Sequence, residues 1–122
     1  MIGECIRMIW NEARNCTYEE KQYIASVYWN RLNSKLKFNK PKADFLGLQK
    51  NVVIQTNDID ELAFEECVSA ALMTQTEKIR KEIGTNDFIF FNLSGEMKNK
   101  YYKLEKFKKN NFKHTFYKAV TK

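Results

Sequence analysis

Residues 2–33 read IGECIRMIWNEARNCTYEEKQYIASVYWNRLN, and this stretch decides the fold because it predicts two helices separated by a short turn. One stripe of the first helix carries the apolar side chains Ile2, Cys5, Ile6, Ile9 and Ala13. Glu12 falls beside Cys5 and Met8, on the flank of that stripe and away from the polar side of the helix. We therefore expect a helix over residues 2–14 in which the Glu12 side chain is partly covered.

A capping sequence marks the start of the second helix. Thr17-Tyr18-Glu19-Glu20 has the S/T-x-x-E form, in which the Thr17 hydroxyl accepts from a backbone N–H and Glu20 reaches back to the cap. The helix is predicted to run from Tyr18 to about Asn33. Its expected polar face consists of Gln22, Ser26 and Asn30. Arg31 lies among the covered positions, and a covered guanidinium needs an anionic or carbonyl partner, so Arg31 is expected to tie this helix to a neighbouring element.

Further helices and then strands are predicted in the rest of the chain. Residues 34–57 contain the only proline, Pro41, and read as an irregular connection in which the apolar run 52–54 fits a short strand. Helices are expected over residues 58–74 and 76–83, the second ending at Gly84. Strands are expected over 87–92 and 112–117, the latter paired with 104–108 through a turn at Asn110-Asn111. The expected fold is α+β, mainly helical with a small antiparallel sheet near the C-terminus.

Composition and charge limit the classes of function. With 122 residues, four Gly, one Pro and 43% hydrophobic side chains, the chain fits a single packed domain over residues 1–122. The formal charge of +6 favours anionic partners such as nucleic acid, anionic lipid or the phosphate-rich polymers of a Gram-positive wall. No nucleic-acid-binding signature accompanies that charge in the sequence, so nucleic acid is not the expected partner.

The cysteines and apolar runs point to neither a metal nor a membrane. Cys5, Cys16 and Cys67 have the spacing of neither a zinc signature nor a disulfide framework, and no cofactor or metal is expected. No apolar stretch is long enough to span a bilayer.

Three parts of the sequence share a register with a known family. They are Trp10-Asn11-Glu12-Ala13-Arg14, then Ala25-x-Val27-x-x-Asn30-Arg31, then the closing segments 90–92 and 111–117. In this order they resemble the aromatic-Gly-Glu-Ala-Arg-Gly-Glu opening, the Ala-x-Val-x-x-Asn-Arg segment, and the Phe-Tyr-Asn and Gly-Asn-His-x-Phe-Tyr strands of SleB-like cell-wall hydrolases. The spacing from Glu12 to Asn30-Arg31 matches without a gap. Asn15 and Cys16 depart from the pattern, because the family has Gly and a second Glu there.

The resemblance implies a function and a set of site residues. It implies a lysozyme-like fold in which Glu12 protonates the glycosidic oxygen between N-acetylmuramic acid and N-acetylglucosamine of peptidoglycan. The expected sugar-binding residues are Phe91, Asn92, His114 and Tyr117, with Asn30 and Arg31 as structural support. The chain would then be a peptidoglycan lytic transglycosylase or a muramidase-type glycosidase.

The chemistry of Glu12 favours the first of these activities. A general acid must keep its proton near neutral pH, and both the apolar flank and the end of the helix are expected to raise the pKa of Glu12, whereas Arg14 would lower it if it folds back. Hydrolysis also needs a second carboxylate about 5 to 9.5 Å away. Asp44, Glu66 and Asp87 are candidates by composition only. A lytic transglycosylase can use one Glu, first as acid and then as base toward the C6 hydroxyl of muramic acid.

Competing interpretations remain for the residues and for the chain. Phe91, Phe112 and Phe116 also fit plain core packing, and His114 also fits a structural role. The alternative for the whole chain is a non-catalytic basic protein of the same fold, either a phage structural subunit or a nucleic-acid binder. The Lys/Asn/Phe-rich composition without a signal sequence favours a bacteriophage or an AT-rich bacterium. Synthesis in the cytoplasm and delivery to the wall by a holin or the virion would follow, with peptidoglycan strands and other virion or lysis proteins as partners.

Overall fold

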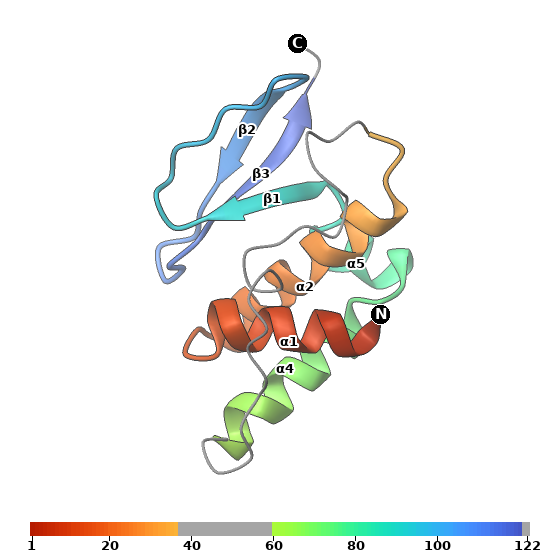
Figure 1. Cartoon of the computed structure of the whole chain (residues 1–122), viewed down its shortest axis with the longest axis vertical. Helices are drawn as coiled ribbons and strands as arrows, with labels where there is room; N and C mark the ends of the chain where they lie inside the picture. The colour runs from red at the N-terminus through yellow and green to blue at the C-terminus, as the bar shows by residue number, and fades with distance from the viewer. Residues whose placement is uncertain (37–59, 121–122) are drawn as a thin grey trace.

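The computed structural model describes residues 1–36 and 60–120. In this part of the chain four helices precede a three-stranded antiparallel sheet: α1 (Ile2–Ala13), α2 (Tyr18–Asn33), α4 (Glu61–Met73), α5 (Glu77–Ile83), β1 (Phe88–Asn92), β2 (Lys103–Phe107) and β3 (Thr115–Val120). The sheet lies at one end of the molecule and α4 at the other, and α2 lies between the sheet and α1 and α4 (Figure 1). The predicted α+β class is confirmed. Pro41, Asp44 and the predicted strand 52–54 lie outside the described residues.

The two opening helices begin and end where the sequence predicts. Cys5, Met8, Ile9, Trp10 and Ala13 form the buried side of α1, and the Trp10 ring meets Phe64 of α4 edge-on at 6.0 Å between ring centres. Thr17 caps α2 by accepting from the backbone N–H of Glu20 at 3.2 Å. α5 ends at Gly84, which takes the left-handed conformation with φ of 78°.

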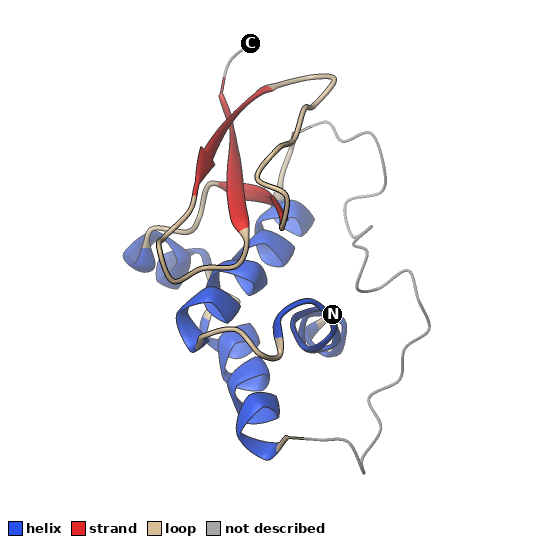
Figure 2. Cartoon of the chain, turned by 90° about the vertical axis from the view of Figure 1, so that its left-hand side faces the viewer, coloured by secondary structure: helices blue, strands red, loops and turns tan. Residues whose placement is uncertain are grey.

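The predicted polar face of α2 is wrong, because α2 is the central helix of the molecule. It contacts α1 and α4 on one side and β1 on the other (Figure 2). Ser26 and Asn30 are therefore buried, and their polar atoms bind protein groups. The Ser26 hydroxyl shares a hydrogen bond of 2.7 Å with the Thr85 hydroxyl, and Asn30 Nδ2 donates to the carbonyl oxygens of Thr85 and Phe88, each at 2.8 Å. These polar side chains fasten the connection between α5 and β1 to α2.

The sheet has the order β1-β3-β2, with β3 antiparallel to both neighbours. The predicted hairpin between β2 and β3 is confirmed. However, β3 starts at Thr115, three residues later than the predicted start at residue 112. The difference has a physical cause: the backbone N–H groups of Lys113 and His114 donate to the Glu20 side chain and do not join the ladder.

The start of β3 has no exposed face. Thr115, Phe116 and Tyr117 are all buried, so both faces of β3 are covered at this end. The turn that follows β1 contributes to this cover, because the Tyr117 hydroxyl donates to Asn92 Oδ1 at 2.9 Å and Asn92 also accepts from the Gly95 N–H.

Aromatic rings join the helices to the sheet. Tyr23 of α2 contacts the rings of Phe88, Phe107, Phe112 and Phe116, with ring centres 5.0 to 6.0 Å apart. Core packing is therefore the role of Phe112 and Phe116, and Phe91 packs against the same cluster. None of the described helices is long and apolar enough to cross a bilayer.

Candidate functional site

Glu12 lies in the last turn of α1 and is half-buried, as its position on the helix predicts. Met8 and Cys5, one and two turns earlier on the same side, are fully buried. The Arg14 guanidinium stacks on the Trp10 ring, with Cζ 5.2 Å from the ring centre. Because two residues along a helix are rotated by about 200°, the Trp10–Arg14 pair lies on the other side of α1 from Glu12.

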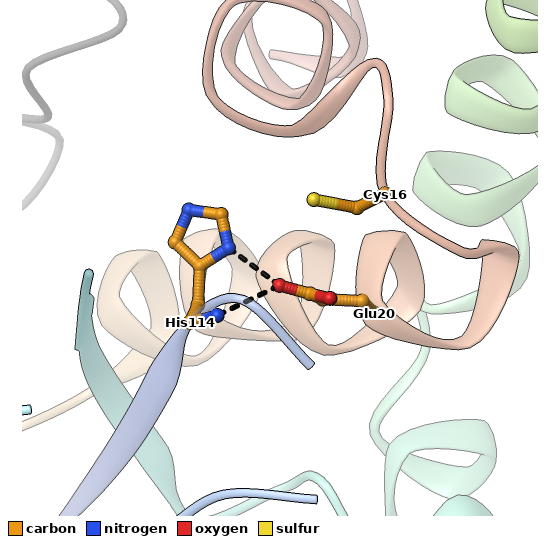
Figure 3. A group of neighbouring side chains, drawn as sticks. All are labelled: Cys16, Glu20 and His114. Carbon is orange, nitrogen blue, oxygen red and sulfur yellow. Dashed lines mark hydrogen bonds and ion pairs between the residues drawn. The ribbon is translucent and has the colours of Figure 1, made fainter. Parts of the chain in front are cut away.

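A buried cluster of Cys16, Glu20 and His114 follows directly on α1 (Figure 3). The predicted capping box is only half formed, because the Glu20 carboxylate does not return to the cap. It crosses to the segment before β3, where it accepts from the backbone N–H groups of Lys113 at 3.0 Å and His114 at 2.9 Å. Its Oε2 also lies 2.5 Å from His114 Nδ1. One side chain therefore ties the N-terminus of α2 to the last strand.

The Glu20–His114 pair is almost completely removed from solvent, because Glu20 is 0% exposed and His114 is 2% exposed. A buried carboxylate is tolerable only when donors satisfy it, and here three N–H groups do so. The contact with Glu20 assigns the imidazole proton to Nδ1. Nε2 is buried and has no hydrogen-bond partner within the described residues.

Cys16 completes the cluster from the turn between α1 and α2. One ligand atom each from Cys16, Glu20 and His114 lies within 4.8 Å of the other two. Burial, followed by the negative charge of Glu20, raises the pKa of Cys16 to about 11, so the thiol keeps its proton at neutral pH. Nδ1 of His114 is also engaged by Glu20. The cluster therefore lacks the thiolate–base arrangement of a cysteine nucleophile.

The four predicted sugar-binding residues fall into two pairs. The Phe91 ring lies edge-on to the His114 ring, with centres 5.5 Å apart. Tyr117 binds Asn92, whose amide also donates to the Glu96 carbonyl and so holds the turn after β1. Phe91 and Asn92 are half-buried, whereas His114 and Tyr117 are buried. Phe91 and His114 thus belong to the cluster with Glu20, and Asn92 and Tyr117 belong to the turn after β1.

Asn30 and Arg31 have the supporting roles that the sequence predicts. Besides its two donated bonds, Asn30 accepts from Arg80 Nε at 2.7 Å, and Arg80 also donates to the carbonyl oxygens of Thr74 and Gln75. Arg31 is buried, and its Cζ lies 5.3 Å from the centre of the Phe90 ring in β1. Arg31 of α2 thus contacts β1 through the Phe90 ring.

A large hollow lies beside the C-terminal end of α2. It has a volume of about 830 Å³ and is lined by Asn30, Asn33, Arg80, Asp87, Glu105 and Lys118, among others. Of these residues, Asn30 and Asn33 belong to the C-terminal end of α2. They lie about 15 to 20 Å along the helix from Glu20. Two of the carboxylates lining the hollow, Glu77 and Glu105, are exposed and paired with lysines. These two carboxylates therefore lack the burial that a general acid needs.

The described candidates for a second carboxylate have other surroundings. Glu66 binds the buried Lys21 ammonium at 2.7 Å, and Asp87 lines the hollow. Asp44 lies outside the described residues.

Sequence reasoning missed Glu20 and Cys16 as members of the site. The two residues are four positions apart at the start of α2, and this spacing could have indicated that their side chains are neighbours. The spacing does not indicate that His114 is the third member of the cluster. The fold and site define an α+β protein with a buried carboxylate–imidazole pair and, in the last turn of α1, a half-buried glutamate. No family model, no curated protein and no solved structure matches the chain.

Proposed function

We propose that the chain cleaves the glycan strand of peptidoglycan between N-acetylmuramic acid and N-acetylglucosamine, as a lysozyme-like lytic transglycosylase with Glu12 as acid and base. One observation carries the proposal: the Asn30-Arg31 segment and the closing segments that resemble SleB-like cell-wall hydrolases contact one another. Asn30 binds the start of β1, Arg31 stacks on Phe90, and Phe91 packs on His114. Residues that match in sequence register are thus joined in space around α2.

The setting of Glu12 supports an acid role. Its carboxyl group is half-buried beside fully buried apolar side chains and sits at the C-terminal end of α1. Both conditions favour the protonated form of a carboxyl group. In the proposed reaction Glu12 gives its proton to the glycosidic oxygen as the bond to C1 of muramic acid breaks. The resulting carboxylate then accepts the proton of the C6 hydroxyl as O6 bonds to C1, which yields a 1,6-anhydro end and consumes no water.

The state of the other carboxylates supports this single-carboxylate route. Glu20 is fully buried and accepts from three N–H groups, and Glu66 is neutralised by Lys21. Hydrolysis with two carboxylates would need one of them free to activate water or attack C1. Transglycosylation needs only Glu12.

Burial divides the proposed sugar contacts by role. Phe91 and Asn92 are half-buried and are the proposed direct contacts, whereas His114 and Tyr117 are buried and position them. The charge of +6 favours association with anionic wall polymers. Delivery to the wall by a virion or a holin belongs to the same proposal.

The test compares Glu12→Gln with the wild type on purified peptidoglycan, by loss of turbidity and by zymogram. Glu4→Gln is the matched control, because it makes the same change on the exposed first turn of the same helix. We expect Glu12→Gln to lose at least about 100-fold in rate and Glu4→Gln to stay near wild type. Mass spectrometry of the products should show anhydro ends.

Other outcomes would decide against parts of the proposal. Equal clearing by Glu12→Gln and wild type would remove Glu12 as the acid. Reducing ends in place of anhydro ends would indicate hydrolysis. If no folded variant clears the wall, the non-catalytic protein of the same fold is the better interpretation.

A further inference from the structure

We propose that Cys16, Glu20 and His114 bind one divalent transition metal of the zinc class. Thiolate, carboxylate and imidazole are the ligand types that zinc accepts, and a thiolate disfavours magnesium and calcium. The three side chains come from separate parts of the chain, namely the turn after α1, the first turn of α2 and the segment before β3, and they converge on one point (Figure 3). The proposal is independent of the glycan cleavage assigned to Glu12.

The spacing of the ligand atoms is close to that of a metal site. A tetrahedral zinc ion, about 2.0 to 2.3 Å from each ligand atom, holds those atoms roughly 3.3 to 3.6 Å apart. Here they all lie within 4.8 Å of one another, and Glu20 Oε2 is 2.5 Å from His114 Nδ1. A metal ion would take the place of the Nδ1 proton and the thiol proton. The required adjustment is about 1 Å in side chains whose backbones are already positioned.

Charge balance also favours a divalent ion. Cys16 as a thiolate and Glu20 as a carboxylate bring two negative charges, and a neutral His114 brings none. A metal of charge +2 therefore leaves the buried cluster neutral, which lowers the cost of burying its members. In the absence of a cation the negative charge of Glu20 is one of the causes that raise the pKa of the Cys16 thiol.

The surroundings of the cluster can support a bound metal. The backbone N–H groups of Lys113 and His114 already orient the Glu20 carboxylate, as outer partners of metal ligands do. Binding at Nδ1 moves the ring proton to Nε2, which has no partner within the described residues in either state, so no further polar group becomes unpaired. Three protein ligands leave a fourth coordination position, which water commonly fills in zinc sites of this kind.

The test uses the whole chain, stripped with a chelator and titrated with Co²⁺ and then with Zn²⁺. We expect one equivalent of Co²⁺, a sulfur-to-cobalt charge-transfer band, and displacement of that band by Zn²⁺. Cys16→Ser should lose the band and at least about 10-fold in affinity. Cys67→Ala is the matched control, since it removes another free cysteine at a site in the core, and should keep both.

Stability and pH give independent readouts. Zn²⁺ should raise the melting temperature of the wild type and leave that of Cys16→Ser unchanged. Metal affinity should rise with pH, because binding releases the thiol proton. Binding well below one equivalent, or equal binding by Cys16→Ser, would overturn the proposal. Glu12→Gln should bind metal as the wild type does, so failure of the metal site and failure of the catalytic proposal can be told apart.

Discussion

Asn30→Ala tests whether the buried polar contacts of α2 hold the helices to the sheet. The amide makes three buried hydrogen bonds, donating to Thr85 and Phe88 and accepting from Arg80. Each neutral bond is worth about 1 kcal/mol and the bond from the guanidinium about 1.5 to 3 kcal/mol. We therefore expect a loss of about 4 kcal/mol in the free energy of unfolding, or roughly 12 °C in melting temperature.

The assay is unfolding in urea, followed by tryptophan fluorescence. Trp10 and Trp29 are both buried, so their emission reports exposure of the core. Asn33→Ala is the control, because Asn33 is exposed one turn later on α2 and its amide donates only to the Trp29 carbonyl of its own helix. The control should lose no more than about 0.5 kcal/mol.

Two results would refute this reasoning. One is a loss below about 1 kcal/mol for Asn30→Ala, which would mean that water or local movement satisfies the groups left behind. The other is an equal loss for Asn33→Ala, which would assign the effect to helix propensity and not to the buried contacts.

The remaining predictions concern buried charge and buried thiols. Glu66→Gln should destabilise the protein by about 2 kcal/mol, because it leaves the Lys21 ammonium, 1% exposed, without its anion, whereas Lys21→Met should lose less. A larger loss for Lys21→Met in the same urea assay would contradict this. Burial raises the pKa of Cys67 to about 11. The unfolded chain therefore releases the thiol proton at a lower pH than the folded chain. The contribution of this thiol to the free energy of unfolding is present below about pH 8.5 and is lost as the pH rises through 11. Cys67→Ala should remove up to about 2 to 3 kcal/mol of that pH dependence, and an unchanged slope would show that the thiol does not contribute.

Local signals were sufficient to predict the helices of the described chain. Thr17 and Gly84 act at helix ends through neighbouring backbone groups, so the sequence nearby contains the whole cause. The start of β3 was not predictable in this way. An alternating pattern over 112–117 fits a strand, but Glu20, far away in sequence, takes the N–H groups that residues 113 and 114 would have offered to a ladder.

The same distinction applies to the candidate site. The position of Glu12 on the flank of α1 follows from helical periodicity alone, and the structure places it there. The role of Glu20 does not follow, because a capping box and a long-range tie to His114 fit the same four residues equally well. The exposure of Ser26 and Asn30 was mispredicted for a related reason: whether a polar side of a helix meets water depends on what packs over it.

The order of the strands has a consequence for how the protein is made. β3 is the middle strand of the sheet, yet it follows β1 and β2 along the chain, and the register pairs each of these strands with β3. On the ribosome, therefore, β1 and β2 emerge before the strand that joins them, and α1 and α2 emerge before the segment that satisfies the buried Glu20 carboxylate. The sheet cannot close during elongation, and its formation must wait until residue 120 has left the exit tunnel.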